Sequence, residues 1–111
     1  MPHLVRDRRV FPRYPLVLAA EVIERDTGTL LTSRTSDISR SGCYIDTVNP
    51  MPAGTPVRVL LTHEDETVEL SAQIVYVSPG LGMGIRFENP IPLKYLAVLD
   101  RWPEDVARSE S

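Results

Sequence analysis

The stretch 67–77, Thr-Val-Glu-Leu-Ser-Ala-Gln-Ile-Val-Tyr-Val, decides the fold class of this chain. Apolar side chains recur at every second position, and polar side chains fill most positions between them. The apolar set is Val68, Leu70, Ala72, Ile74 and Tyr76. Because alternate side chains of a β-strand point to opposite faces, this period of two predicts a strand with one buried face that includes Tyr76.

Five further strand-like segments lie on either side of this stretch, at 16–22, 30–38, 43–48, 57–62 and 81–87. Turns rich in glycine and proline separate most of them. Six short strands at this spacing predict an all-β fold, an antiparallel barrel or sandwich. A closed barrel removes exposed strand edges, which suits a chain of 111 residues. Gly82 and Gly84 mark places where the last strand bends or packs closely.

A helix is expected after the last strand. Pro90 and Pro92 end the sheet, and residues 93–100 have helical spacing. Its residues Leu93, Leu96, Ala97 and Leu99 are expected to cover one opening of the barrel. We therefore divide the chain into a flexible basic arm at 1–14, a barrel with its helix at 15–100, and a polar tail at 101–111.

Composition narrows the class of protein. Hydrophobic residues make up 42% and charged residues 24%, as in ordinary globular domains. No apolar run is long enough for a membrane helix, and the N-terminus does not resemble a signal peptide. Cys43 is the single cysteine and is expected to be a small core residue. These features predict a cytoplasmic protein.

Charge is unevenly distributed along the chain. The first 14 residues hold four arginines and one aspartate, a net charge of +3. Because the net charge of the whole chain is −3, the remaining residues carry −6. The acidic remainder of the chain argues against a nucleic-acid polymer as partner, because proteins that bind such polymers usually present a broad basic face. This charge distribution favours a protein with one local anion site on its basic arm. The alternative is that the arm is only a solvated tail.

Arg9 and Arg13 are the candidate anion-binding residues of this arm. In an extended segment they lie on the same side, about 13 Å apart, and would reach opposite ends of a ligand. The guanidinium group binds phosphate through two donors and also stacks on a base. Arg8 adds a third candidate contact. Pro12 and Pro15 should keep the arm extended and without ladder hydrogen bonds, so that it orders on binding.

A second polar cluster, Asp37–Gly42 (Asp-Ile-Ser-Arg-Ser-Gly), lies between two predicted strands. The carboxylate of Asp37 can accept from paired donors of a base, and Ser39 can bond a base or a phosphate. Gly42 allows close backbone approach. The alternative is a plain turn in which these side chains bond nearby backbone groups.

Catalytic and metal-binding patterns are not found in the sequence. His63 stands beside three acidic residues on a predicted hairpin tip, without a second histidine nearby. Ser39 and Ser41 lack a nucleophile-elbow pattern, and Cys43 lacks a local base. We therefore predict neither enzyme activity, nor a metal, nor a cofactor.

Both clusters together resemble the PilZ domain family. Arg9 and Arg13 match its motif of two arginines separated by three residues, and Asp37–Gly42 matches its motif Asp/Asn-x-Ser-x-x-Gly. The segment 82–87, Gly-Met-Gly-Ile-Arg-Phe, is similar to the family's late strand. The resemblance spans roughly residues 6 to 100. Each motif alone is common, but both in this order form a more specific signal.

The resemblance implies a six-stranded antiparallel β-barrel with a C-terminal helix that binds cyclic di-GMP, a bacterial second messenger. It further implies a stand-alone receptor that acts on a protein partner controlling motility, adhesion or exopolysaccharide. The implied ligand-binding residues are Arg8, Arg9, Arg13, Asp37, Ser39 and Gly42. Whether one or two ligand molecules bind, a choice that the residue at Arg8 influences in this family, stays open. So does the oligomeric state.

Two other functions remain open. The first is a protein-interaction module of the same fold that does not bind the nucleotide. The second is a small barrel that binds oligonucleotides, against which the acidic body and the low aromatic content of 6% both argue, because stacking platforms need aromatic side chains.

Overall fold

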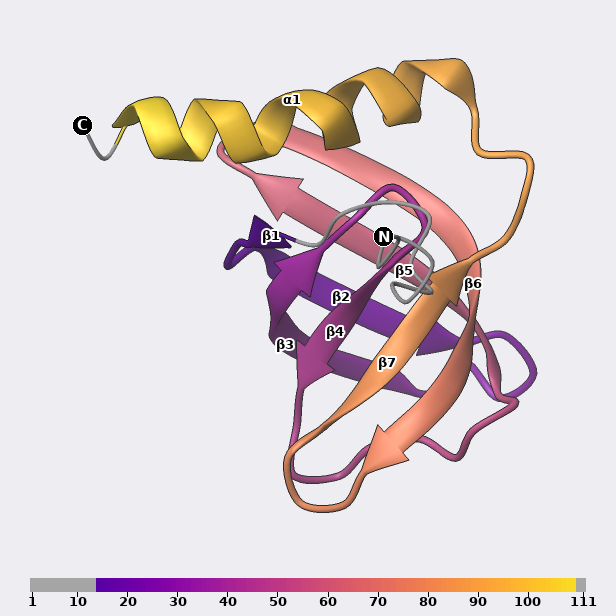
Figure 1. The fold of residues 1–111 in the computed structure, drawn as a ribbon. Coiled ribbons are helices and arrows are strands. Elements are labelled where there is room, and N and C mark those ends of the chain that lie inside the picture. Colours follow the sequence, from indigo (N-terminus) through magenta and orange to yellow (C-terminus); the bar gives the residue numbers. More distant parts are fainter. Residues whose placement is uncertain (1–13, 110–111) are drawn as a thin grey trace, which may run out of the picture.

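The computed structural model describes residues 14–109, with side chains for residues 14–105. This part of the chain forms an antiparallel β-barrel and one helix (Figure 1). The elements are β1 (Tyr14–Pro15), β2 (Ala19–Glu24), β3 (Leu30–Ile38), β4 (Gly42–Asp46), β5 (Pro56–His63), β6 (Glu66–Ser78), β7 (Gly82–Phe87) and α1 (Leu93–Ser109).

Six of the strands close into a barrel, in the order β3, β2, β5, β6, β7, β4. Closure comes from β4, which pairs antiparallel with β7 on one side and with β3 on the other. The short β1 lies outside this ring and pairs only with β3. The predicted all-β barrel with a C-terminal helix is therefore confirmed.

Alternating apolar residues fill the barrel interior, as the period of two predicts. Those with less than 2% of their surface exposed include Ile38, Ile45, Val57, Val59, Leu61, Val68, Ile74, Met83 and Ile85. Cys43 is also fully buried, as expected of a small core residue. In the first predicted strand, Leu16, Leu18, Ala20 and Val22 are all buried.

The prediction for Tyr76 is wrong. The pairing of β6 with β7 shifts by one residue between Ile74 and Tyr76, so that Val75 is the extra residue of a β-bulge. The bulge reverses the inward and outward positions that follow it. Tyr76 is consequently 47% exposed, whereas Val77 packs against the core.

The helix is longer than predicted and turned differently about its axis. It continues to Ser109, nine residues beyond the expected end at Asp100, so the segment expected as a polar tail begins as helix. Leu93, predicted to cover the barrel, is 82% exposed, and Ala97 is also exposed. The predictions for Leu96 and Leu99 are confirmed, since both pack on the barrel, together with Tyr95, Val98 and Trp102.

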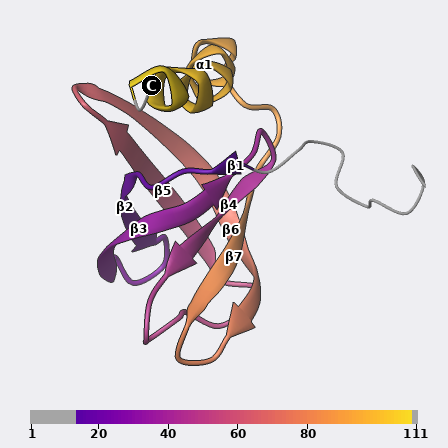
Figure 2. The same cartoon turned by 60° about the vertical axis from the view of Figure 1, so that its left-hand side comes forward.

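Trp102 explains this orientation of the helix. Its side chain is fully buried, and its ring meets the ring of His63 edge-on with centroids 6.0 Å apart. The indole Nε1 donates a hydrogen bond to Oε1 of Glu66 at 3.2 Å, and Arg101 also pairs with Glu66. The helix thus lies across one end of the barrel, held at the β5–β6 hairpin (Figure 1; Figure 2).

Candidate functional site

The cluster Asp37–Gly42 forms the tight connection between β3 and β4. Asp37 belongs to the end of β3, and Gly42 is the first residue of β4. Ser39 is buried and organises the turn: its backbone N–H donates to the carbonyl of Gly42 at 2.8 Å, and its Oγ accepts from the backbone N–H of Ser41 at 3.1 Å. The local turn considered in the sequence analysis is therefore present at Ser39.

Gly42 is required by close packing of the barrel backbone. A Cβ atom at this position would overlap the backbone carbonyl of Ile85 in β7. Close backbone approach was expected at Gly42, and it occurs between two strands of the protein itself. The fold therefore explains this glycine without any ligand.

Asp37 is turned to the outer face of the barrel by a second bulge. The pairing of β3 with β4 shifts by one residue between Thr35 and Asp37, so Ser36 is the extra residue. Thr35 and Ile38 are both buried, and Asp37 between them is half-buried opposite Tyr44 of β4. Its carboxylate is thus on the surface of the strand that leads into the motif turn.

The three candidate arginines, Arg8, Arg9 and Arg13, lie outside the described residues. The described chain begins at Tyr14, the residue after Arg13, and Tyr14 pairs with Ile38 while Pro15 pairs with Asp37. The expectation that Pro15 would stay out of a ladder is wrong. Proline lacks an N–H donor but is tolerated on an edge strand, the position that β1 occupies.

Two other arginines near the motif have contacts on the barrel. Arg40, in the turn itself, forms an ion pair with Asp100 of α1 at 3.1 Å. Arg86 is exposed on the outer face of β7, as predicted, and donates to Oε1 of Gln73 at 3.4 Å. Because Gly42 pairs with Arg86, this cation lies beside the motif turn.

Sequence reasoning missed Tyr44, which is the cross-strand neighbour of Asp37. Its outward position follows from the burial of Cys43 and Ile45 on either side of it. The alternation of residues 43–45 therefore contained the signal that Tyr44 faces outward. The pairing with Asp37 could not be found in the same way, because it depends on the bulge at Ser36.

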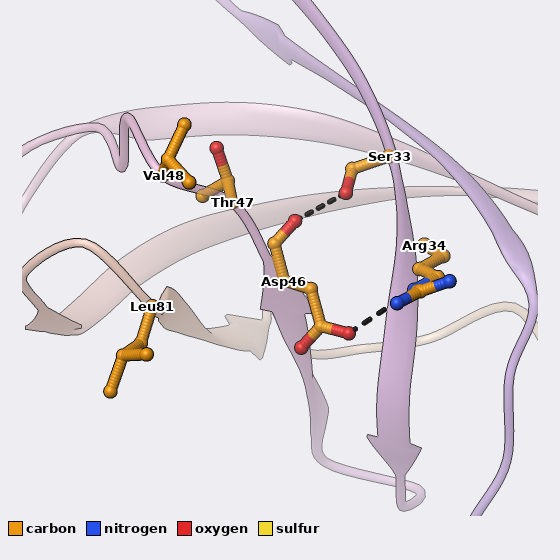
Figure 3. A pocket seen from close by; sticks show the side chains of 6 residues that line it. All are labelled: Ser33, Arg34, Asp46, Thr47, Val48 and Leu81. Atoms are coloured by element: carbon orange, nitrogen blue, oxygen red, sulfur yellow. Dashed lines mark hydrogen bonds and ion pairs between the residues drawn. The ribbon is translucent and has the colours of Figure 1, made fainter.

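A separate pocket lies at the other end of β4, where that strand leaves the barrel (Figure 3). It has a volume of about 460 Å³ and contains none of the predicted site residues. Arg34 pairs there with Asp46 at 3.3 Å, and Ser33 donates to the Asp46 carbonyl. Its lining residues are Ser33, Arg34, Asp46, Thr47, Val48 and Leu81.

The described part of the chain offers neither a metal site nor a membrane-spanning helix. No group of three histidine, cysteine or acidic residues there is arranged to hold a metal ion. Nor does any helix there combine the length and the apolar character needed to cross a membrane.

A protein-family model matches most of this chain. The model of the PilZ domain matches residues 7–103, which include both motifs. The chain belongs to the PilZ domain family. The resemblance inferred from the two motifs and the late strand is therefore confirmed. No curated protein matches this PilZ domain.

Solved structures similar to this PilZ domain include two isolated domains. The PilZ domain of CeSA from a cellulose synthesizing bacterium has a TM-score of 0.67 and 23% identity, over 86% of this chain and 98% of the other. The PilZ domain of YcgR from Escherichia coli, solved with c-di-GMP, has a TM-score of 0.75 and 17% identity, over 94% and 95%.

A third similar structure is the MrkH–c-di-GMP complex of K. pneumonia, with a TM-score of 0.75 and 14% identity. The match covers 94% of this chain but 54% of MrkH, so this PilZ domain spans about half of that protein. At these identities the likeness shows a shared fold.

Proposed function

We propose that this PilZ domain is a receptor for cyclic di-GMP. The observation that carries the proposal is the pairing of β1 with β3, in which Tyr14 lies opposite Ile38 and Pro15 opposite Asp37. Tyr14 directly follows Arg13 in the sequence, so the described chain begins beside the second motif. This supports the proposal that both motifs contribute to one site.

The chemistry of these residues fits the ligand. Cyclic di-GMP offers two guanines and two phosphates. In the proposed site Arg9 and Arg13 bind phosphate or the guanine O6/N7 edge through paired donors, and Arg8 adds a further cation. Asp37 accepts hydrogen bonds from the N–H edge of a guanine, since an ionised carboxylate is an acceptor at both oxygens. Ser39 and Gly42 hold the turn that positions Asp37.

The bound receptor would then act on a protein partner that governs motility, adhesion or exopolysaccharide. A ligand changes such a partner only if it binds two states of the receptor with different affinity. We propose that ligand binding orders the Arg6–Arg13 segment against the barrel face that carries Asp37, Ser39 and Gly42. This would supply the difference, because it changes the surface next to β1 and β3. Similar proteins solved as c-di-GMP complexes, YcgR and MrkH, support the ligand but not the partner.

Isothermal titration calorimetry of the purified chain tests the proposal. The wild type should bind cyclic di-GMP. Arg9→Ala, Arg13→Ala and Asp37→Asn should each weaken binding by about tenfold to a hundredfold, because each removes a charge-assisted hydrogen bond worth roughly 1.5–3 kcal/mol. Arg58→Ala is the matched control, since Arg58 is an exposed arginine paired with Glu69 across the β5–β6 ladder. No heat up to high micromolar ligand would reject the proposal.

The alternative of a protein-interaction module that does not bind the nucleotide is favoured by one observation. Ser39 and Gly42 are both explained by the turn and by packing against β7, so their presence in the motif does not require a ligand. A pull-down of partners that is unchanged by cyclic di-GMP, together with a silent titration, would support this alternative.

A further inference from the structure

A row of residues crosses the outer surface of the barrel beside Asp37. In register, Asp37 of β3 lies opposite Tyr44 of β4, Tyr44 opposite Gly84 of β7, and Gly84 opposite Tyr76 of β6. Both bulges contribute to this row, since they turn Asp37 and Tyr76 outward. One carboxylate and two aromatic rings therefore share a single face, although the four strands are distant in sequence.

Glycines allow both rings to lie against the sheet. A Cβ atom on Gly84 would overlap the Tyr76 ring, and a Cβ atom on Gly82 would overlap the Tyr44 ring. The ring centroids are 6.1 Å apart, with 38° between the ring planes. Tyr76 nevertheless remains 47% exposed, so its ring both covers the backbone and presents surface to the outside.

We propose that Tyr44 and Tyr76 form an aromatic platform on which a purine base of the ligand stacks. The inference rests on the proposed function and adds binding residues that neither motif contains. Adjacent strands lie about 4.8 Å apart, so Asp37 and Tyr76, three strands apart, are separated by about 14 Å across the sheet. A ligand with two bases can place one base edge at Asp37 and one base face on the rings.

The charge next to the platform fits the same ligand. Arg86 lies two residues from Gly84 on the outer face of β7, and its hydrogen bond to Gln73 is long at 3.4 Å. A cation in this position can meet a phosphate of a nucleotide whose base stacks on Tyr76. The overall aromatic content is low, but the fold brings two of the few aromatic residues together beside the motif carboxylate.

A purely structural role for the rings is the competing explanation, because aromatic side chains also cover backbone glycines in sheets. Substitution of Tyr76 separates the two roles. Tyr76→Leu keeps an apolar cover over Gly84 but removes the aromatic face, whereas Tyr76→Phe keeps the face and removes only the hydroxyl group. Gly84→Ala keeps both tyrosines and displaces the Tyr76 ring.

The experiment is calorimetric titration of cyclic di-GMP into these variants, with NMR of the ligand's guanine H8 protons. Base stacking on an aromatic ring predicts binding about five- to a hundredfold weaker in Tyr76→Leu and nearly unchanged in Tyr76→Phe. In the Tyr76→Leu background, Gly84→Ala should cause no additional loss. The wild-type complex should show upfield-shifted H8 resonances and H8 contacts with tyrosine ring protons.

The outcomes distinguish failure of the platform from failure of the proposed function. Wild-type binding with an equally tight Tyr76→Leu variant overturns the platform and leaves the receptor intact. Absence of wild-type binding overturns both. Should Tyr76→Leu fail to fold, the wild-type NMR spectrum decides alone: H8 protons without ring contacts or an upfield shift overturn the platform.

Discussion

Gly42 shows that a motif residue can be required by the fold instead of the ligand. Its backbone lies so close to the carbonyl of Ile85 that no Cβ atom fits between β4 and β7. The obstructing atom is backbone, so a larger residue can be accommodated only if the two strands move apart. A loss of ligand binding in a Gly42 variant would therefore reflect a changed barrel, and Asp37→Asn is the more direct probe of ligand contact.

We predict that Gly42→Ala lowers the free energy of unfolding by about 1–3 kcal/mol, the usual cost of forcing extra atoms into a well-packed site. Urea denaturation of both proteins measures this difference. Leu30→Ala, at an exposed position of β3, is a control that should change stability much less. An unchanged urea midpoint in Gly42→Ala would show that β4 and β7 separate easily at this point.

Single residues also mark the limit of what the sequence predicts. The period of two correctly placed Val68, Leu70 and Ile74 in the core, because each long strand has one face against the interior. It failed at Tyr76 because one extra residue, Val75, reverses the alternation. The bulge at Ser36 has the same effect on Asp37, and neither bulge has a local sequence signature.

At the scale of elements, the helix depends on contacts that its own sequence pattern does not contain. Residues 93–100 have helical spacing, but their orientation on the barrel is fixed by Trp102, which lies beyond them. Its partners, His63 and Glu66, are on the β5–β6 hairpin, over thirty residues earlier. Helix type was therefore predictable from local periodicity, whereas its extent and buried face required tertiary contacts.

Glu66 makes this anchoring sensitive to pH. The hydrogen bonds from Arg101 and then Trp102 hold the pKa of the Glu66 carboxyl below its ordinary value, because both donors favour the charged form. A depressed pKa in the folded state adds stability above the unfolded pKa of about 4.3, and this stability is lost as the pH falls through the folded pKa.

We therefore predict that wild type is more stable than Glu66→Gln at about pH 6 and that this advantage shrinks toward about pH 3. Urea unfolding followed by the fluorescence of Trp102, the single tryptophan, measures the difference at each pH. Glu64→Gln removes an exposed carboxylate from the same turn and should show no comparable trend. A difference between wild type and Glu66→Gln that is independent of pH would contradict the role of this carboxylate.

For the whole molecule, the motif turn is a junction of distant segments. β1 pairs with the end of β3, Phe87 at the end of β7 donates its backbone N–H to the Ser41 carbonyl at 2.8 Å, and Arg40 reaches Asp100 of α1. The Arg40–Asp100 pair is exposed on both sides, and such pairs contribute roughly 0–1 kcal/mol. Ligand binding at this junction should consequently act on the stability of the barrel as a whole more than on the helix alone.

The last prediction follows from this arrangement. A ligand that binds only the folded chain stabilises it by about 2.7 kcal/mol at a concentration one hundred times its Kd. For a domain of this size, that corresponds to a rise in Tm of about 10 °C. Differential scanning calorimetry with and without cyclic di-GMP measures the rise. Arg13→Ala at the same ligand concentration should show a much smaller rise, because the arm would no longer join the ligand to the barrel. Equal rises in wild type and Arg13→Ala would mean that the ligand binds the barrel without the arm, and the proposal that both motifs contribute to one site would be wrong.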